Sequence, residues 1–442
     1  MARRRTRIPL NVYLNGKLIG QLRREGSGAI DFQYELAWLE WDNAIPVSLS
    51  LPLREDHYIG EPVIAVFDNL LPDNQDIRRR VAERSQAEGT DAYSLLSAIG
   101  RDCVGALQFL PEGSSPEPSG TIKAARLSDK EVAKLLGDLT RSPLGIGDDK
   151  EFRISLAGAQ EKTALLFWKN AWHMPHGTTP TTHIFKPQIG KLSSGIDLSQ
   201  SVENEHFCMR LVEALGLPVA RSEIKEFGGS NVLVVERFDR LWTKDKRLLR
   251  IPQEDCCQAL GVLPTKKNEA EGGPGIRAIV DLLKGSDTPT SDQRRFLKAQ
   301  IVFWLLAATD GHAKNFSLQL APEGRFMMAP LYDIVSTQPL LDAGQLSKRQ
   351  MKLSMAVGSS RHYGEYAVHP RHYLQTASLC GLPDKTIRDI FDELVADGNR
   401  AIDETMSRLS RKFPQRLAAS IAKGFKGRLA LIAEMSQKNK NY

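Results

Sequence analysis

The strongest signal in the sequence is the stretch Ala308-Thr-Asp310-Gly-His-Ala-Lys-Asn315-Phe316, followed further along the chain by Leu331-Tyr-Asp333-Ile334. Asp310 and Asn315 have the spacing D-x-x-x-x-N, with which protein kinases place a catalytic Asp beside a metal-binding Asn. Asp310 can accept the proton of an attacking hydroxyl, while Asn315 and Asp333 offer the oxygen ligands that Mg²⁺ prefers. Each residue alone is more often a cap or a turn residue. The three in this order favour phosphoryl transfer over a structural loop.

A loop of small residues lies upstream, in Ser155-Leu-Ala157-Gly158-Ala159-Gln160-Glu161-Lys162-Thr163, and it leads into a predicted strand. Backbone amides can approach phosphate groups where side chains are this small. The loop is not a Walker A motif, because Glu161 occupies the glycine position before Lys162, and its single glycine does not match G-x-G-x-x-G. Taken alone, it is equally compatible with a plain hairpin turn.

Two further positions fit a nucleotide site. Lys186 follows Lys162 by 24 residues on a predicted strand, where a lysine could pair with the α- and β-phosphates. The alternative is an ordinary exposed strand lysine. Val235-Glu236-Arg-Phe238 ends the last strand before the helical half, where a hinge would hold adenine through backbone groups.

The first part of the chain mixes strand and helix signals. Asn15-Gly16 predicts a hairpin within Val12–Ile19, and Ile45–Leu51 alternates with the period of a strand. Pro62–Glu88 has helical periodicity interrupted at Asp68–Asn74. Pro111–Gly120 has the composition of an extended linker, so we place a domain boundary there.

The remainder predicts a sheet-rich part followed by a helical part. The expected strands are Thr163–Trp168, His183–Lys186 and Asn231–Phe238, with a helix over Ser201–Leu215 between them. After Pro252 the expected helices are Arg294–Ala308, Pro383–Val395, Asn399–Leu409 and Phe413–Met435. The last helix carries one apolar stripe, made of Leu417, Ile421, Phe425, Leu429 and Ile432. The predicted domains are residues 1–110, 121–250 and 251–442.

Composition limits the class of protein. With 442 residues, 41% hydrophobic and 25% charged, the chain is typical of folded globular domains. Five cysteines without a C-x-x-C pair argue against a disulfide framework or a zinc ribbon and favour a reducing, intracellular compartment. The N-terminus lacks the apolar stretch of a secretory signal, and the longest apolar run, Ile301–Ala308, is far shorter than a membrane span.

Some residues attract only structural interpretations. The pairs His173-x-x-His176 and His369-x-x-His372 lack a visible third metal ligand, so we expect surface histidines. Cys256-Cys257 is expected to be a buried, reduced pair. The net charge of +6 is concentrated at the ends, with nine Lys/Arg and one Glu from Arg408 to Tyr442. Such a cluster suits contact with phosphates, or it is simply the solvated face of a terminal helix.

The motifs together resemble HipA-type serine/threonine kinases, the toxin half of HipBA toxin–antitoxin modules. The resemblance covers nearly the whole chain, and its segments are Phe152–Leu166, Gly177–Lys186, Glu236–Arg240, Pro252–Asp255, Gly272–Gly275 and Thr309–Asn315. It implies an α+β, two-lobed protein-kinase-like (phosphatidylinositol-kinase-like) fold, with a sheet-rich N-lobe, an extra N-terminal subdomain and an all-helical C-lobe. It also implies ATP and Mg²⁺ as cofactors.

The resemblance implies roles for individual residues. Asp310 would be the general base, Asn315 and Asp333 would hold the metal, and Lys186 would contact the phosphates. The other implied nucleotide contacts are Ala157, Gly158, Ala159, Gln160, Glu161 and Lys162 in the loop, Glu236 and Phe238 at the hinge, and His312, Lys314 and Tyr332. Ser155 matches the serine that family members autophosphorylate.

A phosphate on Ser155 would have a physical consequence of its own. It adds a charge of about −1.5 to −2 just before the phosphate-covering loop, and it would repel the phosphates of ATP. We therefore expect self-inactivation. The alternative for Ser155 is a simple turn or cap serine.

The resemblance also implies partners. These are a HipB-like antitoxin, operator DNA reached through the antitoxin complex, and a protein substrate of the translation machinery, an aminoacyl-tRNA synthetase of the glutamyl type. No membrane association is expected, and the implied location is the cytoplasm, with nucleoid association in the antitoxin complex. Two other classes stay open: a kinase of small molecules or lipids, and a non-catalytic corepressor.

Overall fold

The computed structural model describes residues 8–26, 28–118, 120–146, 153–158 and 160–440, with side chains as far as residue 437. The chain divides into two compact units. Unit 1 comprises Met1–Pro187, Lys225–Thr265 and Leu318–Phe326, and unit 2 comprises Gln188–Ile224, Lys266–Ser317 and Met327–Tyr442.

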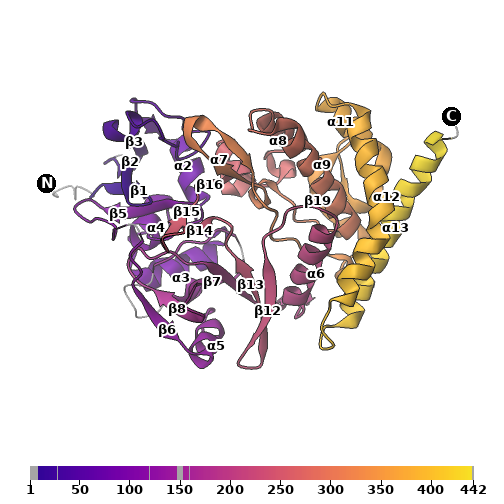
Figure 1. Ribbon diagram of the computed structural model, residues 1–442, viewed down its shortest axis with the longest axis horizontal. Helices are drawn as coiled ribbons and strands as arrows, with labels where there is room; N and C mark the ends of the chain where they lie inside the picture. Colours follow the sequence, from indigo (N-terminus) through magenta and orange to yellow (C-terminus); the bar gives the residue numbers. More distant parts are fainter. Residues whose placement is uncertain (1–7, 27, 119, 147–152, 159, 441–442) are drawn as a thin grey trace. The chain divides into compact units, whose positions relative to one another are not determined.

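Unit 1 begins with a five-stranded antiparallel sheet in the order β4-β3-β2-β1-β5 (Figure 1). Its strands are β1 (Leu10–Leu14), β2 (Lys17–Arg24), β3 (Ile30–Tyr34), β4 (Tyr58–Ile59) and β5 (Leu107–Pro111). The Asn15-Gly16 turn between β1 and β2 has positive φ at both residues, as a two-residue hairpin turn requires. The predicted hairpin is confirmed.

Short helices cover this sheet: α1 (Leu36–Leu39), α2 (Glu61–Asp68), α3 (Gln75–Ser85) and α4 (Ala92–Ile99). Val12, Phe32, Phe67 and Leu95, all 1% exposed or less, lie in their shared core. The interruption predicted between two helices is the turn that separates α2 from α3, and Asn74 caps α3 by accepting hydrogen bonds from the amides of Asp76 and Ile77.

Residues 45–51 do not form the strand that their alternation suggests. Only an isolated bridge joins Ser48 to Leu51. The amide of Val47 donates to the Tyr34 hydroxyl at 2.9 Å, and the amide of Leu49 donates to the Glu254 carboxyl at 2.9 Å. Side chains therefore satisfy the backbone amides of Val47 and Leu49, and no neighbouring strand pairs with them.

Glu254 lies in β16 (Gln253–Asp255) and is fully buried. It bonds to the Ser48 hydroxyl at 2.5 Å and to the Leu49 amide, but burial outweighs these hydrogen bonds and raises the pKa of Glu254 to about 8. The carboxyl is therefore mostly protonated in the folded chain at neutral pH, whereas it is ionised in the unfolded chain.

This difference predicts a pH dependence of stability. A raised folded-state pKa contributes stability below pH about 4.5 that is lost as the pH rises toward about 8. Relative to Glu254→Gln, we expect the unfolding free energy of the wild type to fall by up to about 1.4 kcal/mol per pH unit in this window. Urea unfolding of both proteins at several pH values checks this. Parallel pH profiles would show that Glu254 is ionised in the folded chain.

A second, six-stranded sheet has the order β12-β13-β9-β7-β8-β6. Its strands are β6 (Ala124–Leu127), β7 (Thr163–Trp168), β8 (Ala171–Pro175), β9 (His183–Pro187), β12 (Ser222–Phe227) and β13 (Ser230–Glu236), which confirms the predicted strands. Helix α5 (Asp129–Gly137), which begins with a capping box at Ser128, contributes Val132 to the core of this sheet. Two smaller strands, β14 (Arg240–Trp242) and β15 (Leu248–Arg250), pair with each other.

The predicted linker is not free of contacts. Glu117 accepts hydrogen bonds from the Thr178 hydroxyl at 2.5 Å and from its amide at 3.2 Å. The core of the five-stranded sheet also takes in Leu144, Ile154 and Leu156, which follow the linker. One continuous core therefore runs across the boundary that we predict at residues 111–120.

Unit 2 is mainly helical. Its helices are α6 (Ser201–Ala214), α8 (Ile276–Leu283), α9 (Pro289–Leu306), α10 (Gln338–Asp342), α11 (Pro370–Leu379), α12 (Asp384–Ser407) and α13 (Gln415–Lys440). Residues 251–442 include the further short helix α7 (Cys256–Ala259). The all-helical description of this range is too strong, because it also contains the strands β16, β17 (Ser317–Leu320), β18 (Phe326–Met328), β19 (Lys352–Val357) and β20 (His362–Gly364). The pair β10 (Gly190–Lys191) and β11 (Asp197–Leu198) completes the unit.

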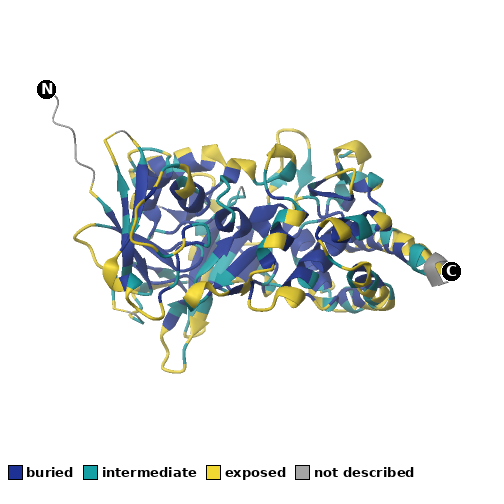
Figure 2. Ribbon diagram, turned by 90° about the horizontal axis from the view of Figure 1, so that it is seen from above, coloured by how far each residue is buried: buried dark blue, intermediate teal, exposed yellow. Residues whose placement is uncertain are grey.

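The two helices expected over 383–395 and 399–409 are one helix, α12. Gly398, a poor helix former, lies inside it, and a Cβ there would be 2.7 Å from the Leu429 side chain on α13. Glycine thus permits the close approach of α13. The predicted apolar stripe of α13 is confirmed, because Leu417, Ile421, Phe425, Leu429 and Ile432 are all buried. In Figure 2 the helices near the C-terminus carry buried residues on one side and exposed residues on the other.

The cysteines lie where the sequence predicts, whereas two of the histidines do not. All five cysteines are buried free thiols, including the Cys256-Cys257 pair. His173 and His372 are buried, contrary to the surface position that we expect, and His372 stacks on His362 at 4.0 Å. Within the described ranges, no group of three or more His, Cys, Asp or Glu side chains could hold a metal ion, and no helix has both the length and the apolar character to cross a membrane.

Candidate active site

The predicted catalytic loop, Thr309–Asn315, follows α9, which is buried continuously from Phe296 to its end. The helix stops at Ala307, whose φ of 52° is left-handed. The backbone carbonyl of Asp310 then accepts two hydrogen bonds, from the Asn315 side-chain amide at 2.6 Å and from the His312 amide at 2.9 Å. The Asp310 side chain is 76% exposed. The loop therefore fixes the backbone of Asp310 and leaves its carboxylate exposed to solvent.

The close contact between this loop and α9 explains why residue 311 is a glycine. A Cβ at this position would lie 2.6 Å from the Phe303 ring of α9, a distance that no side chain tolerates. The loop can therefore lie close against the helix that carries it.

His312, Lys314 and Asn315 are buried within the loop. The Nε2 atom of His312 lies 3.7 Å from the Asp310 carboxylate. The Tyr332 hydroxyl donates to the Lys314 carbonyl at 2.8 Å and lies 2.6 Å from the Ser317 hydroxyl. His312 thus lies beside Asp310, and the Tyr332 hydroxyl joins the loop at Lys314 to the segment of Asp333.

Asp333 is held in a left-handed conformation, with φ of 59°. The residue two places before it, Leu331, exchanges backbone hydrogen bonds with Pro218 and Ala220 at 2.9 and 2.8 Å. After Asp333, the Asn204 side chain of α6 forms two hydrogen bonds with the backbone of Ser336. It donates to the Ser336 carbonyl at 2.8 Å and accepts from the Ser336 amide at 2.9 Å. Contacts on both sides therefore maintain a backbone conformation that costs energy at a non-glycine residue.

The donor set of unit 2 fits Mg²⁺. Because the side-chain nitrogen of Asn315 already donates to Asp310, its Oδ1 atom is the end left to bind a ligand. The Asp333 carboxylate supplies a second oxygen of the kind that Mg²⁺ accepts alongside phosphate oxygens and water.

The predicted phosphate-covering loop, residues 155–162, belongs to unit 1 and packs against the turn between α2 and α3. Ser155 is fully buried, and its hydroxyl donates to the Leu70 carbonyl at 2.8 Å. Gly158, at φ of 104°, pairs with Pro72, and its carbonyl accepts from the Asp73 amide at 3.0 Å. The loop is therefore fastened to the N-terminal part of the chain, an attachment that sequence periodicity does not show.

The side chains of this loop also bond to protein groups. Lys162 donates to the Ala157 carbonyl at 2.7 Å, and Gln160 donates to the Pro187 carbonyl at 3.2 Å. Glu161 forms an ion pair with Arg80 of α3. Ala159 lies outside the described residues. Glu161 and Gln160 therefore contact protein groups in this conformation, whereas we expect them to contact the nucleotide.

Lys186 occupies the middle of the six-stranded sheet, in β9 opposite Leu233 of β13. It is only 7% exposed, which rules out the ordinary exposed strand lysine. At the end of β13, Glu236 is exposed and Phe238 is partly buried, while Arg237 and Asp239 between and after them are buried.

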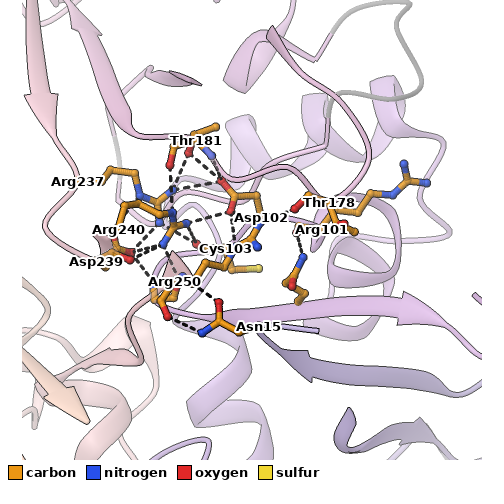
Figure 3. A network of polar contacts seen from close by, with 12 residues as sticks. Asn15, Arg101, Asp102, Cys103, Thr178, Thr181, Arg237, Asp239, Arg240 and Arg250 are labelled. Carbon is orange, nitrogen blue, oxygen red and sulfur yellow. Dashed lines mark hydrogen bonds and ion pairs between the residues drawn. The ribbon is translucent and has the colours of Figure 1, made fainter. Parts of the chain in front are cut away.

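Arg237 and Asp239 belong to a buried ion network, shown in Figure 3, that is not predicted from the sequence. The Asp102 carboxylate meets Arg240 and Arg250, each at 2.9 Å, and Arg237 at 3.4 Å. Arg237 also pairs with Asp239 at 2.7 Å. Burial alone would raise the pKa of Asp102, but the guanidinium groups of Arg240, Arg250 and Arg237 lower it below its ordinary value.

The same aspartate is linked to the phosphate-covering loop. Its backbone carbonyl accepts a hydrogen bond from the Ser155 amide at 2.9 Å, and its carboxylate also accepts from the Thr181 amide and hydroxyl at 3.0 and 2.8 Å. Asp102 thus joins the loop, the segment just before β9 and the residues that follow β13. Arg237 and Asp239 carry opposite charges two residues apart in the sequence, and this spacing is the signal from which part of the network could have been found.

Comparison with known proteins gives the family. Residues 154–402 match the HipA-like C-terminal domain, and residues 10–110 match the HipA N-terminal domain. The chain belongs to the HipA family. The first match alone spans more than half of the chain.

Relatives cover nearly the full length. The chain is 34% identical to the putative kinase Y4mE of Sinorhizobium fredii, over 90% of this chain and 92% of that protein. It is 29% identical to the serine/threonine-protein kinase toxin HipA of Shewanella oneidensis, over 94% and 89% respectively. The solved complex of Shewanella oneidensis HipA, HipB and operator DNA contains a chain with a TM-score of 0.80 and 25% identity, covering 97% of this chain and 99% of that one. This HipA-family chain therefore has the HipA fold and belongs to a family of kinases.

Proposed function

We propose that this chain transfers the γ-phosphate of ATP to serine or threonine hydroxyls of proteins. The observation that carries the proposal is the exposed Asp310 carboxylate on a backbone anchored by Asn315 and His312. That combination suits a general base that must reach a substrate hydroxyl while its own position stays fixed.

The chemistry follows from the side chains. The substrate oxygen forms a bond to the γ-phosphorus as the bond between that phosphorus and the β,γ-bridging oxygen breaks, ADP leaves, and the hydroxyl proton passes to Asp310. Lys186 contacts the nucleotide phosphates, and its burial strengthens that interaction by excluding water. Asn315 and Asp333 would hold Mg²⁺, which would supply positive charge beside the phosphate oxygens.

Ser155 is the proposed site of self-phosphorylation. In the described conformation it is fully buried, so the loop must first release the Leu70 and Asp73 contacts. A phosphoserine oxygen cannot donate to the Leu70 carbonyl, and the added charge of about −2 cannot enter this buried position without a partner. The modified loop is therefore excluded from its former place, and the enzyme inactivates itself.

The biological role that we propose is that of a toxin in a toxin–antitoxin module in the cytoplasm. A HipB-like antitoxin would bind the kinase and recruit it to operator DNA at the nucleoid, and the protein substrate would be an aminoacyl-tRNA synthetase of the glutamyl type. The kinase toxin among the relatives and the complex with HipB and operator DNA support this role.

Mass spectrometry of the purified protein with Mg²⁺ and ATP tests the activity. We expect one phosphate on Ser155 in the wild type and none in Asp310→Asn. ATP turnover with no phosphoprotein, even with cell lysate as substrate, would replace the proposal with a small-molecule kinase. ATP binding without turnover would favour a non-catalytic corepressor.

Self-inactivation makes a separate prediction about Ser155→Ala. Once phosphorylated, the wild type should lose at least about tenfold of its activity toward a protein substrate, since the displaced loop no longer covers ATP. Ser155→Ala should keep a constant rate over the same incubation. Progress curves with radiolabelled ATP measure both. If the two proteins slow down equally, phosphorylation of Ser155 does not control activity.

A further inference from the structure

The C-terminal end of α9 holds three backbone carbonyls whose partners connect it to other parts of unit 2. The Leu305 carbonyl accepts from Nε of Arg428 at 2.9 Å, and the Leu306 carbonyl accepts from the Ser336 hydroxyl at 2.5 Å. The Ala307 carbonyl accepts from the amide and hydroxyl of Thr337 at 2.9 and 2.8 Å. The last carbonyls of a helix have no partner inside the helix, so these contacts fix where it ends.

The residues that form these hydrogen bonds lie close in sequence to Asp310 and Asp333. Asp310 comes three residues after Ala307, and Ser336 comes three residues after Asp333. The hydrogen bonds of Ser336 and Thr337 therefore join the start of the catalytic loop to the segment that carries the second metal ligand. The spacing between the general base and the metal-binding carboxylate depends on this junction.

Arg428 of α13 connects the same junction to a third element. Its Nη1 atom donates to Gln338 at 3.0 Å and to Glu365 at 2.7 Å, while Nε binds the end of α9. The Arg428 side chain is 12% exposed and that of Glu365 is 8% exposed, so this ion pair is largely shielded from water. A positive charge at the C-terminal end of a helix is also favoured by the helix dipole.

The surroundings hold this arginine and its acceptor in one geometry. The Gln338 side chain donates onward to Asp342 at 2.8 Å, and Ser420 of α13 donates to the other oxygen of Asp342 at 2.7 Å. A Cβ at Gly424 would lie 2.4 Å from the Gln338 side-chain oxygen, so a glycine one turn before Arg428 admits Gln338 to the helix surface.

We propose that Arg428 is a positioning residue for phosphoryl transfer. From the C-terminal helix it holds the end of α9 and the start of α10, and thereby the spacing of Asp310 and Asp333. The inference rests on the proposed kinase function. It assigns to α13 a part in the reaction, although α13 supplies no residue of the catalytic loop.

The test is steady-state kinetics of Arg428→Lys with a protein substrate. Lysine keeps the charge but cannot offer two donors in the fixed fork that reaches Leu305 and Gln338 together. We expect kcat to fall about 10- to 100-fold, since a displacement of about 1 Å at a reacting group has an effect of this size. The KM for ATP should stay within about threefold, because Lys186 and the phosphate-covering loop are untouched.

Two more variants keep the test decisive if Arg428→Lys is poorly folded. Ser336→Ala removes one hydrogen bond at the same helix end and should lower kcat several-fold with the same unchanged KM. The double variant should lose less than the product of the single losses, because both changes loosen one junction. Lys423→Met, an exposed position of α13, is the matched control and should behave as the wild type.

The outcomes separate this inference from the function on which it rests. A lower melting temperature with kcat of the folded protein within twofold of the wild type would make Arg428 merely structural and overturn the inference. So would losses that multiply in the double variant, or a rise in KM at constant kcat. A wild type that transfers no phosphate with Mg²⁺ and ATP would overturn the proposed function itself, and the inference with it.

Discussion

Replacement of Asp310 by asparagine is expected to lower the rate of phosphoryl transfer by about 10²- to 10⁴-fold, the usual contribution of a positioned general base. The side chain is 76% exposed, and the loop is anchored through the Asp310 backbone carbonyl. Asparagine keeps this backbone contact and the side-chain size, and it removes only the proton acceptor. The loss should therefore appear in kcat, with the KM for ATP and the melting temperature close to those of the wild type.

The measurement is phosphate incorporation into Ser155 and into an added protein substrate, with Mg²⁺ and ATP at saturation. Asp392→Asn, an exposed aspartate on α12, is the matched control and should show full activity. An active Asp310→Asn would mean that another group accepts the proton. A large drop in its melting temperature would instead assign the loss to folding.

Replacement of Asp102 by asparagine is expected to destabilise unit 1 by about 3–5 kcal/mol, the cost of removing one partner from a buried ion network. Arg237, Arg240 and Arg250 all point at this carboxylate, and their side chains are 5% exposed or less. Without the Asp102 carboxylate, Asp239 would be left to pair with Arg237 and Arg240 in the network shown in Figure 3. The uncompensated positive charge cannot reach water.

Urea unfolding followed by tryptophan fluorescence measures this effect, because five of the six tryptophans belong to unit 1. The control is Asp245→Asn, which removes one carboxylate from an exposed pair with Arg247 and should leave the midpoint nearly unchanged. Equal midpoints for Asp102→Asn and the wild type would mean that the arginines find water or other acceptors. Because Ser155 donates its amide to the Asp102 carbonyl, the phosphate-covering loop should loosen in the same variant.

Local patterns were sufficient for much of the fold. The Asn15-Gly16 turn signal located the hairpin of β1 and β2, and periodicity located the buried stripe of α13, because both depend on residues close in sequence. It failed at residues 45–51, where alternation is the same whether the backbone amides meet a strand or, as here, the side chains of Tyr34 and Glu254. It also divided α12 in two, because Gly398 lowers helix propensity and its contact with Leu429 is not visible in sequence.

For the candidate site, sequence spacing was enough to predict the loop of Asp310 and Asn315, since these residues and the glycine between them form hydrogen bonds and contacts within a few residues or with the adjacent helix. The burial of Lys186 and Ser155 is visible only in the tertiary structure. The tertiary structure also decided that Asp102 faces Arg237, 135 residues away, and that Arg428 holds the end of α9. Burial and ion pairing depend on which distant segments of the chain come into contact, and the spacing of residues along one sequence does not reveal those contacts.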